Sequence, residues 1–473
     1  MSAFFLAILS RTLSPIDQPL QAMPESRGVG LWLPAPPDFI ARWFTTINTS
    51  RLRRDTDSVL PVIQEFKQLI ENDTTLFMYF TSMFDEIPSY SPYDKDVIGN
   101  PQIRDYQHML QSFNEVIQTL PPWNDAANNI GFCGFPINAI LNWPMGTPSG
   151  RSAFLDPRVN AMLKKMLTVW AGYLVSPAST NVLNTNSDGW LSPNAVRALT
   201  TSANLAGHEE IKFHDLYACD PSKPCLVYTY WDNFFTRTFK DGIRPISSPN
   251  DDSILVSPCE AAPYRLANDV SERATFWIKA QPYSLNDMLA NDELVSRFVD
   301  GTVYQAFLSS LSYHRWHSPI SGTVVKAYNI PGAYYSETLL NSFAGEGADP
   351  EATMRSRAYI TAVATRAVIF IPADNDDIGL VCVLFVGMAE VSSCEINVYA
   401  GQHLVKGQEI GMFHFGGSTF CLIFQKDIDL CWEEDCLPPY PENMPNIAVR
   451  RKLATIRGVG HPRAENKEQV QSS

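Results

Sequence analysis

The feature that most constrains the fold is a change in hydrophobic periodicity along the chain. Up to about residue 200, apolar side chains recur every three or four positions, as Val62, Phe66 and Leu69 do, which is the spacing of one helix face. From about residue 225, runs of strand length such as 367–371 and 380–386 are rich in β-branched and aromatic residues. We therefore expect an α+β protein, with a helical N-terminal region followed by a β-rich region.

Capping residues in the sequence predict where two helices begin. Asp73 and Asp156 are each followed by apolar residues at helical spacing, and Pro157 suits a first helical turn. Both aspartates are therefore expected to cap helices. Residues 85–155 are rich in Pro, Gly and Asn and are expected to form long connections.

Strands are expected at 323–328, 367–371 and 380–386, where β-branched and aromatic residues cluster. Residues 372–377, between the last two, are expected to form a hairpin loop. The acidic side chains of this loop are typical of a solvated turn rather than of a metal site. We therefore expect no metal.

Composition limits the classes of protein. The chain has 473 residues, of which 45% are hydrophobic, so it can bury a large core in two or three domains. Its net charge of -14 disfavours nucleic acid and general attraction to anionic membranes. Nine scattered cysteines form neither a disulfide framework nor a paired zinc motif, which favours a reducing cytoplasm. No apolar run approaches the roughly 20 residues of a membrane span, so no stable membrane anchor is expected.

The segment Gly-Gly-Ser-Thr at 416–419 can be interpreted as a self-cleavage site. A glycine leaves room for the following hydroxyl to approach its carbonyl, and Gly417 and Ser418 meet that need. Attack of the Ser418 hydroxyl on the Gly417 carbonyl would form an ester, and loss of the serine α-proton would then expel the upstream carboxylate. Hydrolysis of the resulting dehydroalanine leaves a pyruvoyl group. The same four residues also occur in ordinary turns.

Two of the eight histidines fall in one short segment, Tyr-His-Arg-Trp-His-Ser-Pro at 313–319. Imidazoles take and return protons near neutral pH, so His314 and His317 are candidate proton carriers for cleavage and later chemistry. A zinc pair, or histidines with purely structural hydrogen bonds, would give the same pattern.

Three segments resemble successive signatures of the phosphatidylserine decarboxylase family. They are 230–237, 313–319 and 405–419, they occur in family order, and the resemblance covers about residues 210–426. The family is pyruvoyl-dependent. The resemblance therefore implies cleavage between Gly417 and Ser418 into a large β chain and an α chain of 56 residues, 473 minus 417, headed by the pyruvoyl group.

The resemblance also implies roles for single residues. Ser418 would be nucleophile and cofactor precursor, His317 the base of self-cleavage, and His314 the proton carrier in decarboxylation. Where the family has Pro-x-Asp-Gly this chain has Pro-Cys-Glu-Ala at 258–261, so Glu260 replaces the aspartate that orients the histidine. An ion-paired or surface carboxylate is the alternative for Glu260.

Tyr283 and Ser284 resemble a further family motif and are expected near the substrate. Ordinary strand packing would account for them equally well.

Segments 63–67, 83–85, 189–191 and 389–395 are similar to a soluble fungal branch of the family that includes L-tryptophan decarboxylases. This similarity implies a carboxy-lyase of secondary metabolism that converts a free L-amino acid, L-tryptophan first, into its amine and CO2. The expected partners are the small amino-acid substrate and, for each cleaved chain, the other chain. Alternatives are a true phosphatidylserine decarboxylase making phosphatidylethanolamine, an unprocessed pseudoenzyme, and a binding scaffold similar to biotinyl carriers.

The expected domains are a helical one over 1–205, a catalytic one over 206–440 and a flexible tail over 441–473. The tail is expected because Pro, charged and small polar residues dominate it.

Overall fold

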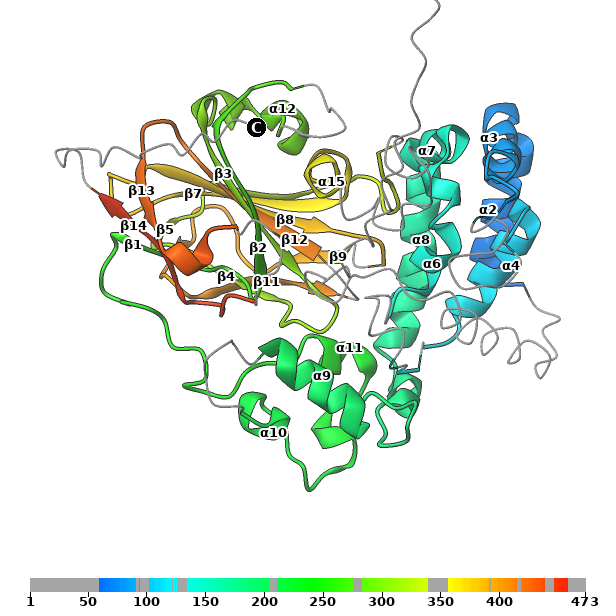
Figure 1. Cartoon of the computed structure of the whole chain (residues 1–473), viewed down its shortest axis with the longest axis horizontal. Helices are drawn as coiled ribbons and strands as arrows, with labels where there is room; N and C mark the ends of the chain where they lie inside the picture. The colour runs from blue at the N-terminus through cyan, green and yellow to red at the C-terminus, as the bar shows by residue number, and fades with distance from the viewer. Residues whose placement is uncertain are drawn as a thin grey trace, which may run out of the picture.

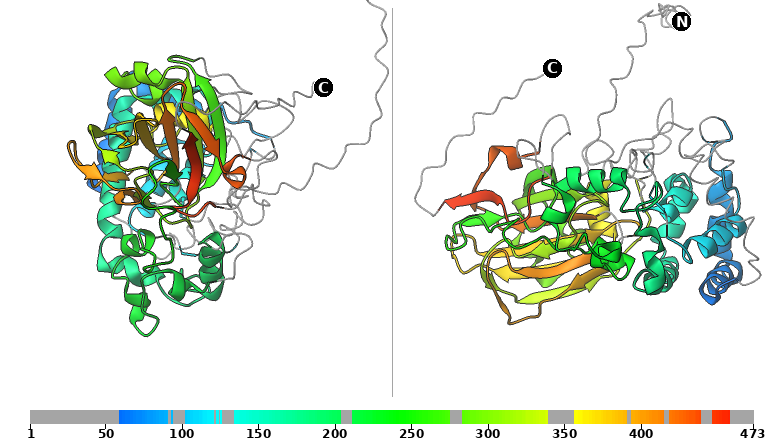
Figure 2. Two further views of the ribbon diagram at one scale, coloured as in Figure 1. Left: turned by 90° about the vertical axis from the view of Figure 1, so that its left-hand side faces the viewer. Right: turned by 90° about the horizontal axis from the view of Figure 1, so that it is seen from below.

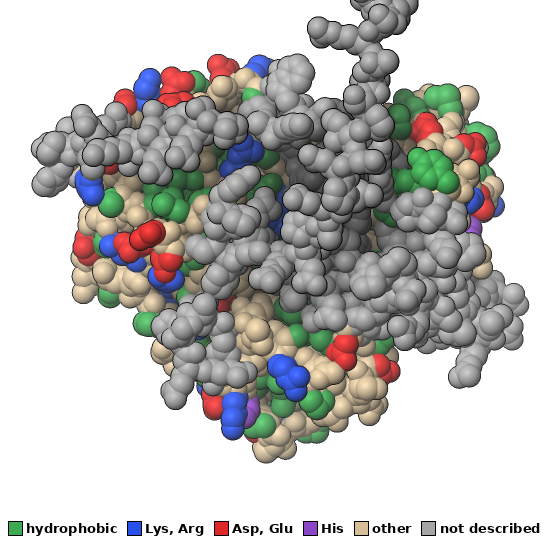
Figure 3. Space-filling model, in the orientation of Figure 1, with side chains coloured by type: hydrophobic (Ala, Val, Ile, Leu, Met, Phe, Trp, Pro, Cys, Tyr) green, Lys and Arg blue, Asp and Glu red, His purple; other side chains and the backbone are tan. Residues whose placement is uncertain are grey.

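The computed structural model describes residues 59–90, 93, 102–120, 122–123, 125, 134–203, 211–274, 283–338, 356–390, 393–414, 418–438 and 446–457. Helices gather on one side of the molecule and a β-rich body forms the other, as three views agree (Figures 1 and 2). The α+β fold class is therefore confirmed. Acidic and basic side chains are interspersed over the described part of the face in Figure 3.

The α-helices are α2 (Pro61–Asn72), α3 (Thr74–Asp85), α4 (Tyr106–Val116), α6 (Pro136–Leu141), α7 (Pro148–Leu155), α8 (Pro157–Leu174), α9 (Pro193–Ala203), α10 (Phe213–Leu216), α11 (Trp231–Phe235), α12 (Leu285–Met288) and α15 (Arg357–Val363). The strands are β1 (Ile254–Val256), β2 (Ala262–Val270), β3 (Gly301–Leu308), β4 (Arg315–His317), β5 (Gly322–Thr323), β6 (Lys326–Ile330), β7 (Arg366–Pro372), β8 (Leu380–Gly387), β9 (Ser393–Ile396), β10 (His403–Leu404), β11 (Glu409–His414), β12 (Ser418–Phe424), β13 (Asp429–Trp432) and β14 (Lys452–Arg457).

Both predicted helix caps are confirmed. The Asp73 carboxylate accepts the backbone N–H of Leu76, and the Asp156 carboxylate accepts that of Arg158. These bonds satisfy donors that a helix start would otherwise leave unpaired, which stabilises both helices. The apolar face of α8 then packs into the core, and Trp170 donates its ring N–H to the Thr119 carbonyl at 2.9 Å.

The prediction of long connections over 85–155 is wrong for much of that range. Helices α4, α6 and α7 lie there. Two of the prolines that marked the range as loop, Pro136 and Pro148, stand in the first turn of α6 and α7, where a missing N–H costs nothing. Composition alone therefore underestimated the helical content.

A six-stranded antiparallel sheet, in the order β2-β3-β12-β8-β7-β6, forms the centre of the β-rich body. Every residue of β8 and β12 is buried, so these strands are covered on both faces. A three-stranded sheet, β4-β11-β9, packs against it. Trp316 of β4 stacks on Phe385 of β8 with ring centroids 3.9 Å apart, which joins the two layers.

The predicted hairpin is confirmed, since β7 and β8 pair on either side of the loop that follows Pro372. The strand expected at 323–328 is divided instead. β5 ends at Thr323 and β6 begins at Lys326. β5 pairs with β10 and β6 with β7, so the chain changes partners at Val324 and Val325, which period-2 patterning cannot reveal.

The flexible tail expected over 441–473 is wrong for residues 446–457, which include β14. This strand pairs with both β1 and β13, so its backbone hydrogen bonds tie it into a sheet. The rest of that range, 441–445 and 458–473, lies outside the described residues, as do the N-terminal residues 1–58 and the boundary expected at 205. Helices continue past 205 to Phe235, and the first strand begins at Ile254.

Candidate active site

Ser418 is the first residue of β12, an interior strand of the central sheet. Its neighbours across the sheet are Leu308 of β3 and Gly387 of β8. The side chain is fully buried, and its hydroxyl has no hydrogen-bond partner within the described residues. Gly417 and the rest of 415–417 lie outside the described residues. A buried hydroxyl without a partner is unusual in a folded protein and is compatible with a reactive group.

Tyr283 is connected to the residue after Ser418. Its hydroxyl donates to the Gln305 side-chain carbonyl at 2.5 Å, and the Gln305 amide donates to the Thr419 hydroxyl at 3.1 Å. Thr419 in turn donates to the carbonyl of Ala306 at 2.7 Å. Burial raises the pKa of Tyr283 well above its usual value, so the phenol stays neutral. Tyr283 therefore braces the start of β12.

Ser284 has a different environment. Its hydroxyl donates to the Asp287 carboxylate at the start of α12 and accepts the backbone N–H of Ala274 at 3.3 Å. Ser284 precedes α12 but its side chain does not cap that helix. A substrate contact by Ser284 stays a prediction.

Two hydrogen bonds place His314 near the ends of β3 and β11, the strand ends closest to Ser418 in the chain and the sheet. Its Nε2–H donates to the carbonyl of Ser309 at 3.1 Å, and Ser309 directly follows Leu308, the strand neighbour of Ser418. Its backbone carbonyl accepts the N–H of Phe413 at 2.9 Å, near the end of β11. The ring also stacks on Phe235, with centroids 4.0 Å apart. Donation from Nε2 makes Nδ1 the basic nitrogen of the neutral ring.

His317 lies further from Ser418 along β11. It pairs with Glu409 at the beginning of that strand, whereas His314 meets Phe413 near its end. Nδ1–H donates to the carbonyl of Gly407 at 3.0 Å, so Nε2 accepts the Tyr313 hydroxyl at 3.0 Å. Burial, with the charge of Arg450 beside the ring, lowers the pKa of His317 to about 3. This imidazole is therefore neutral.

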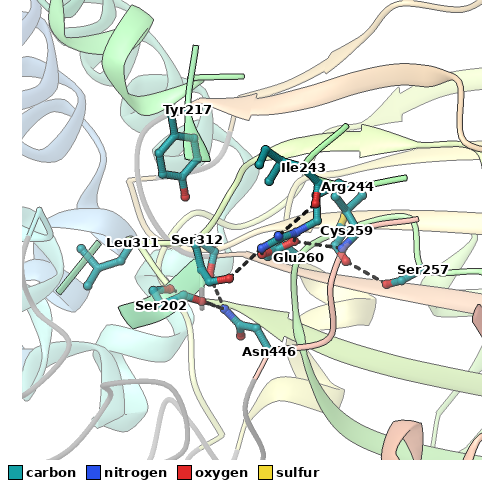
Figure 4. A network of polar contacts seen from close by, with 12 residues as sticks. Ser202, Tyr217, Ile243, Arg244, Ser257, Cys259, Glu260, Leu311, Ser312 and Asn446 are labelled. Atoms are coloured by element: carbon teal, nitrogen blue, oxygen red, sulfur yellow. Dashed lines mark hydrogen bonds and ion pairs between the residues drawn. The ribbon is translucent and has the colours of Figure 1, made fainter. Parts of the chain in front are cut away.

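The Glu260 carboxylate is fully buried and is bound by an arginine. Arg244 donates from Nη2 to Oε1 at 2.5 Å and from Nε to Oε2 at 3.0 Å, and Val449 donates its backbone N–H to Oε2 at 2.9 Å (Figure 4). The described structure thus does not bring Glu260 onto either imidazole. It matches the ion-paired alternative, and the bidentate geometry fixes the orientation of the carboxylate relative to the guanidinium.

An indirect connection runs from Glu260 to His317. The Arg244 guanidinium lies 4.5 Å from the centre of the Phe239 ring. Phe239 stacks on Tyr313 at 4.6 Å, and Tyr313 binds His317 through its hydroxyl. The carboxylate therefore fixes an aromatic stack that holds the histidine.

His414 is a site residue to which the sequence analysis assigned no role. Its Nδ1 lies 3.0 Å from both carboxylate oxygens of Asp232, and its Nε2 lies 3.0 Å from the Glu395 carboxylate. Because a carboxylate only accepts, both ring nitrogens carry hydrogen and the ring is a cation. Burial works to lower the pKa of His414, but the two carboxylates outweigh it and raise the pKa above its usual value. His414 ends β11, directly before 415–417, and its presence within the recognised motif was the available signal.

The described residues were found to contain neither a metal-binding cluster nor a membrane-spanning helix. Among the described residues, no group of three or more His, Cys, Asp or Glu side chains is arranged to hold a metal ion. None of the helices within the described ranges is both long and apolar enough to cross a membrane.

Comparison with known proteins shows the class of protein to which the chain belongs. One family model, described as phosphatidylserine decarboxylase, matches residues 60–199, the helices from α2 to α9. A second model with the same description matches residues 231–438, from α11 to beyond β13. The chain is a decarboxylase, that is, a carboxy-lyase.

The chain belongs to the phosphatidylserine decarboxylase family, which confirms the resemblance inferred from its motifs. It is 35% identical to the L-tryptophan decarboxylase of Psilocybe cubensis over 376 residues, 77% of this chain and 80% of the relative. It is 39% identical to the decarboxylase iboD of Amanita muscaria over 311 residues, 64% of this chain and 87% of the relative. It is 31% identical to the phosphatidylserine decarboxylase proenzyme of Anoxybacillus flavithermus over 217 residues, 46% of this chain and 74% of the relative.

Proposed function

We propose that this decarboxylase acts on a free L-amino acid, with L-tryptophan as first choice, and releases the amine and CO2. The observation that carries the proposal is the share of the chain that aligns with each kind of relative. The L-tryptophan decarboxylases of Psilocybe cubensis and Psilocybe cyanescens align with 77% and 78% of the chain, whereas the phosphatidylserine decarboxylase proenzyme of Anoxybacillus flavithermus aligns with 46%. The longer alignments require similarity beyond the part of the chain that the proenzyme matches.

The proposed cofactor is a pyruvoyl group made from Ser418. Its fit is supported by the buried, unpartnered hydroxyl within the described residues and by the backbone, which two strands hold on either side. The hydroxyl attacks the Gly417 carbonyl, and the ester formed is cleaved by loss of the serine α-proton. Once formed, a pyruvoyl group supplies an electrophilic carbonyl that takes up the electron pair released with CO2.

His314 is the proposed proton carrier in decarboxylation. Its Nε2–H donates to the Ser309 carbonyl, so Nδ1 is the nitrogen of the neutral ring that takes up and returns a proton. The Phe235 ring beside it fixes the plane of the imidazole. The same stack shields one face of the ring from water.

His317 is the proposed base of self-cleavage. Its Nε2 already accepts the Tyr313 hydroxyl, so base action requires Tyr313 to pass a proton on or to move away. Glu260 then contributes by holding Arg244 and the aromatic stack in place, rather than by touching the imidazole.

The two cleaved chains are proposed to stay together. The α chain starts at Ser418 and contains β12, which is hydrogen-bonded to β3 on one side and to β8 on the other. It also contains β14, which pairs with β1 of the larger chain. The eight described cysteines are free thiols, which supports the predicted reducing cytoplasm.

The test is a substrate panel on purified protein. L-tryptophan, other L-amino acids and phosphatidylserine vesicles are each assayed for CO2 and amine. We expect turnover of L-tryptophan and a chain cleaved after Gly417. Conversion of phosphatidylserine without turnover of free amino acids would favour the phosphatidylserine decarboxylase alternative, and a full-length chain without any turnover would favour the pseudoenzyme.

A further inference from the structure

The backbone carbonyl of Gly407 accepts hydrogen bonds from two side chains. One is the Nδ1–H of His317, at 3.0 Å, and the other is the Nε–H of Arg450, at 2.9 Å. A carbonyl oxygen has two lone pairs, so these two bonds fill its capacity as an acceptor. A histidine base is commonly oriented by a carboxylate on its other ring nitrogen. Here a backbone carbonyl that is bound by an arginine stands in that place.

The backbone conformation at Gly407 requires a glycine. Its φ is +79°, in the left-handed region, and a Cβ at this position would lie 2.6 Å from the Ile246 side chain. The N–H of Gly407 donates to the carbonyl of Ser318 at 2.8 Å. The carbonyl that meets His317 therefore belongs to a well-defined turn.

The arginine stands in a segment outside the family model that matches the catalytic region. That model ends at residue 438, and the segment 446–450, which we call the clasp, follows it. Ile447 of the clasp exchanges two backbone hydrogen bonds with Ala261, at 2.7 and 3.2 Å. Val449 of the clasp donates its N–H to the Glu260 carboxylate at 2.9 Å. The clasp is therefore anchored on the Pro-Cys-Glu-Ala segment, where this chain departs from the family motif.

Arg450 has a strained backbone. Its φ is +67°, in the left-handed region that side chains other than those of asparagine and aspartate seldom adopt. Two backbone hydrogen bonds hold this conformation. The N–H of Arg450 donates to the carbonyl of Ser257 at 2.8 Å, and its carbonyl accepts the N–H of Ser247 at 3.0 Å. Such strain persists only where the surrounding structure imposes it, and it is concentrated at functional positions.

The clasp also contacts the support of the other histidine. Asn446 donates a side-chain N–H to the Ser312 hydroxyl at 3.3 Å (Figure 4). That hydroxyl accepts the backbone N–H of Ser309 at 3.2 Å, and the Ser309 carbonyl accepts the Nε2–H of His314. The clasp is thus bonded to the hydrogen-bonded supports of both histidines.

The state of the His317 ring depends on where its one hydrogen lies. Burial and the charge of Arg450 lower the pKa of His317 to about 3, so the ring is neutral. Arg315, a second cation near the ring, is paired with Glu409 at 2.7 Å. Because Nδ1 carries the hydrogen that the carbonyl accepts, Nε2 is the acceptor nitrogen, and the Tyr313 hydroxyl donates to it.

We propose that Arg450 is a positioning residue for self-cleavage, because it holds the Gly407 carbonyl that fixes Nε2 as the accepting nitrogen of His317. The carbonyl and the arginine then take the orienting role that the sequence assigned to Glu260, whose two oxygens are already engaged. This inference rests on the proposed function, in which His317 is the base of cleavage. It extends the cleavage machinery to a segment outside the family model.

Two substitutions of similar length separate this hydrogen bond from packing. Arg450→Gln places an amide N–H donor at the position of Nε, whereas Arg450→Met places a methyl group there. Both variants lack the charge, so they differ in the donor. We expect Arg450→Gln to cleave itself within about threefold of the wild-type rate and Arg450→Met to be roughly 10-fold slower or more. A time course of newly synthesised protein on denaturing electrophoresis, with intact mass, measures the rate.

The tautomer of His317 gives a second readout that needs neither cleavage nor turnover. In the uncleaved Ser418→Ala background, nitrogen NMR of isotope-labelled histidine, assigned with His317→Gln, shows which ring nitrogen carries hydrogen. We expect a bare Nε2 with Arg450 or Arg450→Gln and a mixture of tautomers with Arg450→Met. The matched control is Arg451→Met, which removes the adjacent arginine that binds Asp435 and should change neither readout.

Thermal unfolding of each variant shows whether it is folded. If Arg450→Met is not, Arg450→Gly replaces it, because glycine adopts the left-handed backbone without strain and has no side chain. We expect the same slow cleavage and mixed tautomers from Arg450→Gly.

Equal cleavage rates in folded Arg450→Gln and Arg450→Met would overturn the inference, because the bond from Nε would then have no role of its own. An unchanged tautomer in Arg450→Met would overturn it as well, and in both cases the proposed function stands. Cleavage of His317→Gln at the wild-type rate would instead contradict the proposed base. A wild-type protein that stays uncleaved but decarboxylates its substrate would contradict the proposed cofactor.

Discussion

His414 ends β11, immediately before the segment that holds the proposed cleavage bond, and its charge is set by the carboxylates of Asp232 and Glu395. Since the pKa of His414 is raised in the folded protein, its contribution to stability is fully present below about pH 6.5, the unfolded value. That contribution is lost as pH rises through the higher folded pKa. His414 therefore makes the structure beside Ser418 sensitive to alkaline pH.

We predict that His414→Gln lowers the free energy of unfolding by about 1–2 kcal/mol at pH 6 and by much less at pH 9. Denaturation at both values, in the uncleaved Ser418→Ala background, measures the difference. Glu395→Gln, which removes the more exposed partner, should give a smaller loss. An equal loss at both pH values would show that packing, rather than the cationic ring, stabilises this segment.

Glu260 and Arg244 form a buried pair, so removing one charge leaves the other without compensation. We predict that Glu260→Gln destabilises the protein by roughly 3–5 kcal/mol and that adding Arg244→Met restores much of this loss. Chemical denaturation of the single and double variants measures both the loss of stability and its recovery.

Self-cleavage of the same variants separates two roles of Glu260. If the carboxylate only holds the aromatic stack, the double variant should regain cleavage along with stability. A double variant that is stable but remains uncleaved would instead support the direct relay to a histidine that the sequence predicted.

At the scale of elements, β12 links the proposed cleavage to the association of the two resulting chains. It begins at Ser418 and is paired on both sides along its length, so cutting before it removes no strand from the sheet. We predict that the two cleaved chains elute together in native size-exclusion chromatography and separate only in denaturant. Dissociation in native buffer would contradict the described pairing of β12 and β14.

The elements that local chemistry determines could be predicted from the sequence. Asp73 and Asp156 cap helices because their side chains reach N–H groups nearby in the chain. The hairpin of β7 and β8 is equally local. The break between β5 and β6 was missed because each strand finds a distant partner, and β14 was missed because its composition resembles a tail.

In the candidate site, too, local motifs could be predicted from the sequence but contacts between distant segments could not. Ser418, His314 and His317 stand in recognisable motifs, so the sequence indicated them. The Arg244 partner of Glu260 and the Arg450 side chain on the Gly407 carbonyl come from separate parts of the fold. A single sequence carries no signal for such tertiary contacts.

At the scale of the whole molecule, the helical region contacts the β-rich body next to β8. Glu390 after β8 bonds to α6, and Tyr334 donates its backbone N–H to Asn160 of α8 at 3.1 Å. The family model over 60–199 therefore covers a region that is hydrogen-bonded to the β-rich body next to β8. We predict that Asn160→Ala, which removes one such contact, lowers kcat/KM several-fold while cleavage after Gly417 proceeds. Loss of cleavage in a folded Asn160→Ala protein would contradict a role limited to the decarboxylation step.

The most direct measurement is the intact mass of both chains in a preparation that decarboxylates L-tryptophan. The account predicts a large chain ending at Gly417 and a chain of 56 residues, 418–473, lighter than its serine-headed form by one ammonia. Ser418→Ala should give a single full-length chain without activity. An active preparation that consists of uncleaved chain, or activity that persists in Ser418→Ala, would contradict the account.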